Sequence, residues 1–128
     1  MSDHLVESYD KQLELINSNL VKMGGLVEQQ VKDSLKALDD KDTEFAEEIL
    51  KKDDKIDNLE KEIYALAYKI IAMRQPMAND LRTVVSALSI ANDLERMGDH
   101  ATNVAKRVAN VKVSCLLYTS PSPRDLVI

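Results

Sequence analysis

Apolar residues recur every three or four positions along most of this chain, and this helical period is broken only twice before the last stretch. Glycine and proline number only three each, so the sequence offers few signals that end or bend a helix. Aliphatic residues and methionine supply nearly all of the apolar side chains, because aromatic residues amount to 4%. This composition is typical of a helix bundle rather than a β-sandwich. We therefore predict an all-α fold.

Three apolar stripes define the expected helices. They consist of Leu13, Ile16, Leu20, Met23, Val27, Val31, Leu35 and Leu38, then Phe45, Ile49, Ile56, Leu59, Ile63, Leu66 and Ile70, then Leu81, Val84, Leu88, Ala91, Val104, Val108 and Val111. Polar residues 39–42 separate the first two stripes, and Asp42 can cap the second helix. Pro76 disfavours helix at Gln75 and suits the first position of the third helix. Because short connections make neighbouring helices antiparallel, we expect an up-down-up three-helix bundle.

Residues 115–128 depart from this pattern. They contain the only cysteine and two of the three prolines, and residues 115–125 resemble an in-frame translation of a sequencing adapter. We expect a three-helix bundle over residues 1–114 and a non-native, disordered tail over 115–128. A natural Ser/Pro-rich linker is the alternative.

Several function classes fit the sequence poorly. The net charge is −5 and basic residues are interleaved with acidic ones, which disfavours nucleic-acid binding. The chain has no apolar run long enough for membrane insertion, and its N-terminus lacks an apolar signal segment, so we expect a cytoplasmic protein. Neither a glycine-rich phosphate loop nor a nucleophile motif is present. We therefore expect a binding protein and not an enzyme.

Two pairs of carboxylates are the most informative polar residues. Asp53 and Asp57 precede the second turn by about as many residues as Glu95 and Asp99 follow it, so equal helical rise brings both pairs to one height. Within each pair the spacing is i, i+4, which places both side chains on one side of a helix. Glu95 and Asp99 continue the stripe that faces the other helices. A carboxylate there needs a compensating partner.

These acids form a candidate metal site. Weaker candidate ligands are Glu60, which extends the group on the second helix, and Asn92 and Asn103, which flank Glu95 and Asp99 on the same side of the third helix. Oxygen donors of this kind could hold Fe, Zn, Mn or Mg ions. Ordinary surface salt bridges with lysine or arginine are the alternative. The Glu-x-x-His pattern of di-iron enzymes is absent, since Gly98 is the third residue after Glu95.

Glycines lie at the height of the acids. Gly24 and Gly25 interrupt the first helix, and Gly98 lies between Glu95 and Asp99. Glycine inside a helix costs about 1 kcal/mol relative to alanine. We expect the three helices to approach closely at these glycines, with simple packing as the alternative. His100 points away from Asp99 on a helical wheel and is expected at the surface.

Three segments carry a resemblance to a known family. Residues 54–60 read DKIDNLE, residues 74–82 read RQPMANDLR, and residues 94–104 read LERMGDHATNV. Together they resemble the first repeat of PhoU proteins, from the N-terminus to about residue 114. The resemblance implies that this chain corresponds to one half of a six-helix tandem bundle. It also implies multinuclear metal sites on Glu/Asp-x-x-x-Asp motifs, which Glu95 with Asp99 and Asp53 with Asp57 match.

The resemblance also implies a function. PhoU-like proteins couple a phosphate ABC transporter, through its ATPase subunit, to a sensor histidine kinase and act as negative regulators of phosphate-starvation signalling. Without the second repeat, an exposed apolar face is expected to favour a homodimer. Arg74, Asp80 and Arg82 could dock a partner or simply stabilise the turn. The alternatives are a domain of a sodium–phosphate cotransporter, a metal-free helical adaptor and a carboxylate-bridged redox enzyme.

Overall fold

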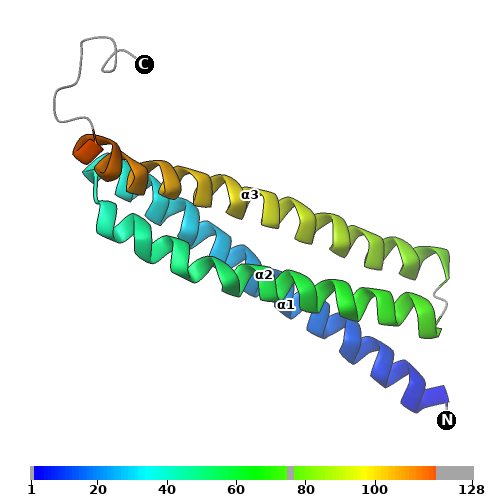
Figure 1. Ribbon diagram of the computed structural model, residues 1–128. Helices are drawn as coiled ribbons and strands as arrows, with labels where there is room; N and C mark the ends of the chain where they lie inside the picture. The colour runs from blue at the N-terminus through cyan, green and yellow to red at the C-terminus, as the bar shows by residue number, and fades with distance from the viewer. Residues whose placement is uncertain (1, 75–76, 118–128) are drawn as a thin grey trace.

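The computed structural model consists of three long helices, as predicted. It describes residues 2–74 and 77–117, with side-chain burial for 9–74 and 77–111. The helices are α1 (Ser2–Asp40), α2 (Thr43–Arg74) and α3 (Ala78–Leu117). They run up, down and up, and α1 diverges from its neighbours towards the N-terminus (Figure 1). Within the described residues, no helix combines the length and apolarity that a bilayer span requires.

The turn between α1 and α2 is closed by local hydrogen bonds. Lys41 has a left-handed backbone, with φ of 54°, and the N–H of Asp42 donates to the Ala37 carbonyl at 2.9 Å. This pattern is the Schellman termination of a helix, in which glycine is the usual left-handed residue. The Asp42 carboxylate then accepts from the Phe45 N–H at 3.0 Å. The predicted cap at Asp42 is therefore confirmed.

The other two predicted boundaries fall near residues that the structure does not describe. α2 ends at Arg74 and α3 begins at Ala78, whereas Gln75 and Pro76 lie outside the described residues. At the C-terminus, α3 extends to Leu117, so the first three residues of the expected tail are helical. Residues 118–128 also lie outside the described residues. The predicted disorder and foreign origin of the tail stay predictions.

The core repeats every seven residues in each helix. The buried positions with this spacing are Ile16, Met23, Gln30 and Ala37 in α1, then Ile49, Ile56, Ile63 and Ile70 in α2, then Val84, Ala91, Gly98 and Ala105 in α3. A seven-residue period is typical of coiled-coil packing, in which the helices wind slightly around each other. The fold is thus a long, regular bundle in which α3 contributes mainly small residues to the core.

The predicted core stripe of α1 is wrong in its second half. Leu35 and Leu38 are 55% and 52% exposed, whereas the buried positions are Gln30, Ser34 and Ala37. The prediction followed the 3.6-residue period of a straight helix, but the helices keep a 3.5-residue period, and the two diverge by about 20° per heptad. In α3, Leu81 and Val111 are also exposed. These leucines and valines form an outer surface instead of the core.

Candidate functional site

The structure brings four acidic side chains together between α2 and α3. These are Asp57, Glu60, Glu95 and Asp99, hereafter the acidic cluster. Their proximity is evident from their electrostatics, because the charges of other cluster members help to raise the pKa of Asp57, of Glu60 and of Glu95. The expected meeting of the two helices' acids is thus observed for Asp57, Glu95 and Asp99, but Asp53 does not belong to the cluster. Glu95 is partly buried and Asp99 exposed, so the cluster lies at the edge of the core and not inside it.

Glu95 is the most perturbed member of the acidic cluster. Partial burial, followed by the charges of Glu60 and Asp99, raises the pKa of Glu95 from 4.5 to about 7. A hydrogen bond with Asp99 favours the protonated form in the same direction. Near neutral pH, Glu95 is therefore only partly ionised. A cation at this position would relieve the same repulsion.

The α2 side of the cluster is perturbed in the same direction. Burial, then the charges of Asp53 and Asp99, raises the pKa of Asp57, while Lys61 acts more weakly in the opposite direction. Burial, then Asp57 and Asp99, raises the pKa of Glu60. The neighbouring Tyr64 has its pKa raised by burial and then by Glu60. Negative charge on this face is therefore poorly compensated by the side chains that the structure describes.

Asp53 belongs to a different group of side chains. Its Oδ1 accepts a hydrogen bond from Gln30 Nε2 at 3.2 Å and contacts the Thr102 hydroxyl at 3.1 Å. Gln30 Nε2 also donates to Thr102 Oγ1 at 2.8 Å, so Gln30, Asp53 and Thr102 join all three helices in one polar layer. Although the charge of Asp53 raises the pKa of Asp57, its hydrogen bonds give it a structural role that sequence reasoning did not foresee.

Sequence reasoning also missed Gln30 and Thr102. Each is only 6% exposed, and the Thr102 hydroxyl lies 2.9 Å from the Gly98 carbonyl as well as near Asp53. A hydroxyl donates one hydrogen, so Thr102 can bond to the Gly98 carbonyl or to Asp53 but not fully to both. Gln30 Oε1 has no partner among the described residues. The exact seven-residue spacing from Met23 through Gln30 to Ala37 was the sequence signal that could have identified Gln30 as a core position.

The donor set of the acidic cluster suits a hard cation, but its side chains are not yet arranged around one. Carboxylate oxygens are the ligands that Mg²⁺, Mn²⁺ and iron prefer. In the described part of the chain, no three Asp, Glu, His or Cys side chains form a ready metal-binding group. The acidic cluster is thus a set of suitable donors and not a formed metal site.

The other candidate ligands do not join the cluster. Asn92 and Asn103 are exposed, and neither is hydrogen-bonded to the cluster carboxylates within residues 9–74 and 77–111. His100 is exposed, as predicted. The salt-bridge alternative is not realised either, since no described lysine or arginine forms an ion pair with a cluster carboxylate. In the described part of the chain, no ion pair joins the four acids to a lysine or arginine, and only the charge of Lys61 acts against the rise in the pKa of Asp57.

The expected close approach at the glycines is wrong for α1. A Cβ atom added to Gly24 or Gly25 would meet nothing within 4 Å, because neither residue faces the core. At Gly98 the nearest atoms would be 3.7 Å away, at Gln30 and Ile56, which is an ordinary packing distance. The helices are therefore not held unusually close at this level.

The proposed docking residues lie at the far end of the bundle. Arg74 Nε donates to Gln12 Oε1 at 2.9 Å, and the Arg74 guanidinium lies 5.8 Å from the centre of the Tyr9 ring. These contacts join α2 to α1, so Arg74 has a structural role there. Asp80 and Arg82 are exposed at the same end, and nothing observed tests whether they contact a partner.

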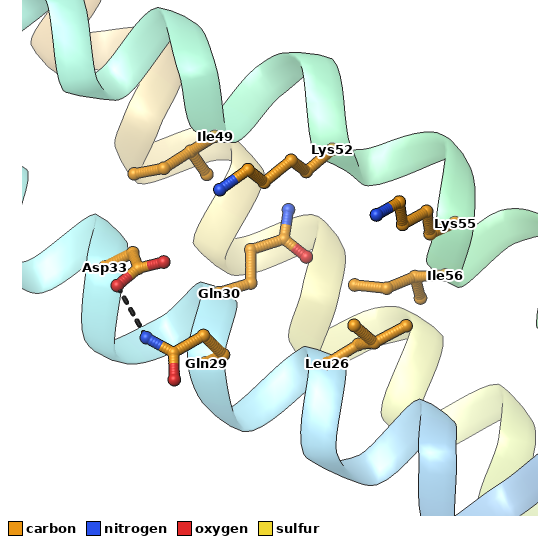
Figure 2. A pocket seen from close by; sticks show the side chains of 8 residues that line it. All are labelled: Leu26, Gln29, Gln30, Asp33, Ile49, Lys52, Lys55 and Ile56. Carbon is orange, nitrogen blue, oxygen red and sulfur yellow. Dashed lines mark hydrogen bonds between the residues drawn. The ribbon is translucent and has the colours of Figure 1, made fainter.

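A cleft of about 220 Å³ lies between α1 and α2. Figure 2 shows Gln30 extending from α1 towards α2, with the amines of Lys52 and Lys55 above an apolar wall that includes Ile56. On the α1 side, Gln29 Nε2 donates to Asp33 at 2.8 Å. The cleft thus has a rim of mixed charge over an apolar floor.

Comparison with known proteins assigns the family. The sequence profile of the PhoU domain family matches residues 20–108. Three relatives named "Phosphate-specific transport system accessory protein PhoU homolog" are 42% identical over 107 residues (Caulobacter vibrioides), 44% over 101 (Clostridium acetobutylicum) and 41% over 127 (Pseudomonas aeruginosa). The aligned regions cover 84%, 78% and 99% of this chain, but only 46%, 46% and 50% of those relatives.

The chain therefore spans about half the length of the curated relatives that it matches. The family match includes the acidic cluster, the polar layer and the turn between α2 and α3. Since the domain model covers more than half of the sequence, the assignment does not depend on a single motif. The chain belongs to the PhoU family.

Proposed function

We propose that this chain is a unit of a regulator of phosphate uptake that contacts the ATPase subunit of a phosphate ABC transporter and a sensor histidine kinase, and acts as a negative regulator. The observation that carries the proposal is the similarity to proteins named as accessory proteins of phosphate-specific transport. A long bundle with fixed helix contacts suits this role, because it offers rigid faces to two partners at once.

Binding to the transporter ATPase tests the proposal directly. Immobilised full chain should retain the ATPase subunit of a phosphate ABC transporter from the same genome, and should not retain the ATPase subunit of an unrelated ABC transporter. The charge-reversal pair Asp80→Lys and Arg82→Glu tests whether the exposed end of the bundle is the contact. Equal retention of both ATPase subunits would contradict a phosphate-specific role.

We further propose that the acidic cluster binds a divalent or trivalent cation. The support is the convergence of four carboxylates from α2 and α3, with no ion pair to a lysine or arginine among the described residues and only weak compensation by Lys61. When bound, the ion would supply the positive charge that these side chains lack and would fix α2 against α3. Asp57, Glu60, Glu95 and Asp99 are the residues that would hold it.

Metal analysis and unfolding together test cation binding. The double variant Glu95→Ala, Asp99→Ala should bind less Fe, Zn, Mn or Mg than the wild type and should lose the rise in unfolding midpoint that the cation causes. Glu44→Ala, Glu48→Ala is the matched control, because it removes two exposed acids with the same spacing from α2. A metal content that is unchanged in the first variant would remove the site and leave a metal-free helical adaptor.

A further inference from the structure

The cleft between α1 and α2 reaches down to the core of the bundle. Its floor includes Ile49 and Ile56, which are only 2% and 3% exposed, and Leu26 adds an apolar wall from α1. An apolar group that enters the cleft therefore exchanges water for contacts with core side chains, which is favourable.

Two lysine amines lie above this apolar floor (Figure 2). Neither Lys52 nor Lys55 forms an ion pair or a hydrogen bond with another described residue. The charges of these amines are thus not neutralised locally, although the chain as a whole has a net charge of −5. An anionic group placed beside the amines would form charge-assisted hydrogen bonds, which are stronger than bonds between neutral groups.

The amides of the cleft offer few further donors to a ligand. Gln29 Nε2 donates to Asp33 at 2.8 Å. Gln30 Nε2 donates to Asp53 and to Thr102, which uses both of its hydrogens. The two lysine amines are therefore the main donors in the lining, and one carboxylate of the lining, that of Asp33, opposes their charge.

The size of the cleft limits the size of its ligand. The lining extends from Leu26 to Asp33 on α1 and from Ile49 to Ile56 on α2, which corresponds to about 10 Å of each helix. A bound helix or extended peptide would need a longer groove. The volume of about 220 Å³ is also smaller than the roughly 300–1,000 Å³ of pockets that hold drug-sized ligands. The cleft therefore suits one compact molecule.

We propose that the cleft between α1 and α2 binds a small organic anion with a compact apolar body. The anionic group, a carboxylate or a phosphoryl group, binds the amines of Lys52 and Lys55, while the body packs against Ile49 and Ile56. The inference does not rest on the proposed function, because no residue of the acidic cluster lines the cleft. Anion binding here can fail while cation binding and transporter binding stand, and the reverse is also true.

Isoleucine δ1-methyl NMR of the full chain tests the cleft, in metal-free buffer so that no metal ion holds the probe elsewhere. Phenyl phosphate and benzoate are the probes, because they carry the two kinds of anionic group on the same apolar ring. We expect the signals of Ile49 and Ile56 to shift to saturation, with a Kd of about 1 mM or tighter for at least one probe. Ile90 is 48% exposed on α3, so an unchanged Ile90 signal excludes unspecific adsorption.

Two further probes separate the contribution of charge from that of the apolar body. Inorganic phosphate carries the charge without the ring, and benzylammonium carries the ring with the opposite charge. Each should bind at least about tenfold more weakly than the better of the two anions, because each lacks one of the two contacts.

The lysines are tested by substitution. The double variant Lys52→Gln, Lys55→Gln removes both amines and should weaken binding of the better anion at least about tenfold. Lys51→Gln, Lys69→Gln is the matched control, because it removes the same charge from exposed positions of α2 that do not line the cleft. Circular dichroism verifies that the variants are helical, and Lys55→Gln decides alone if the first double variant does not fold.

The results that overturn the proposal are specific. The absence of saturating shifts with both anions does so, as does benzylammonium that binds more tightly than either anion. Binding that survives Lys52→Gln, Lys55→Gln unchanged would show that the amines are not the contact. An equal loss in the matched control would show that only the overall charge of the chain attracts the anion, and it also overturns the proposal.

Discussion

Crowded carboxylates dominate the chemistry of single residues in this protein. Glu95 lies near Glu60, Asp99 and Asp57, so its ionisation is opposed by burial and by three charges. The arrangement costs stability in the absence of a cation, because each ionised member repels the others. Residues that reduce stability in this way are common at functional sites.

Replacing Glu95 should reveal this cost. The pKa of Glu95 is about 7 in the folded chain against 4.5 ordinarily, so the folded chain binds more protons between these values. The free energy of unfolding therefore falls as pH rises from about 4.5 to about 7, and this contribution is constant above that range. Glu95→Gln removes the ionisation. In EDTA at about pH 8 it should be more stable than the wild type by about 1 kcal/mol, allowing for solvent screening.

Urea unfolding at several pH values measures the effect. The advantage of Glu95→Gln should disappear near pH 4, where Glu95 is protonated in both the folded and the unfolded chain. Glu47→Gln, an exposed change on the same helix as Glu60, should show little dependence on pH. A wild type that gains stability over Glu95→Gln as pH rises would show that the charge is compensated.

Each helix combines an accurate and an inaccurate part of the sequence prediction. In α2, Ile49, Ile56, Ile63 and Ile70 are all buried as expected, because isoleucines at seven-residue spacing leave no doubt about the inner face. In α1, the apolar residues outnumber the places in the core. The prediction placed Leu35 and Leu38 in the core, but both are exposed, and Gln30 and Ser34 are buried instead.

The candidate site was predictable to a similar degree. Counting residues from the turn correctly brought Asp57 near Glu95 and Asp99, since helical rise is nearly constant, and Glu60 joins them as one of the weaker candidates. It could not show that Asp53 turns towards Gln30, because that choice depends on hydrogen bonds made by a third helix. The prediction of a close approach at Gly24 and Gly25 failed for a related reason. The height of a residue along the bundle does not specify which face of its helix it lies on.

At the scale of the helices, we expect the polar layer of Gln30, Asp53 and Thr102 to stabilise the packing of α1, α2 and α3. Thr102→Val removes the hydroxyl that accepts from Gln30 Nε2 at 2.8 Å and leaves that buried amide partly unpaired. We expect a loss of about 1–3 kcal/mol in the free energy of unfolding, measured in urea. Thr83→Val is the matched control, because Thr83 makes the same bond to the carbonyl four residues earlier, at 3.1 Å, on an exposed surface. Equal effects of the two changes would contradict a structural role for the layer.

At the scale of the whole molecule, excess negative charge opposes the compact state. The net charge is −5, and several acids converge on one face. Salt should therefore raise the unfolding temperature from low ionic strength up to about 0.15 M, where the screening length is about 8 Å. The rise should be smaller in the variant Glu95→Gln, Asp99→Asn, measured by thermal unfolding in EDTA at one protein concentration. A fall in unfolding temperature with salt would show that attractive ion pairs dominate.

The turn at Lys41 and Asp42 has a mechanical consequence. Because α1 and α2 are joined by two residues whose backbone is fixed by hydrogen bonds, the angle between these helices is set at one end of the molecule. α2 contains 32 residues, which corresponds to a lever of about 48 Å. If α2 rotated by one degree about the turn, its other end would move by roughly 0.8 Å. A small change in the angle between α1 and α2 therefore has its largest effect where Arg74 contacts Gln12.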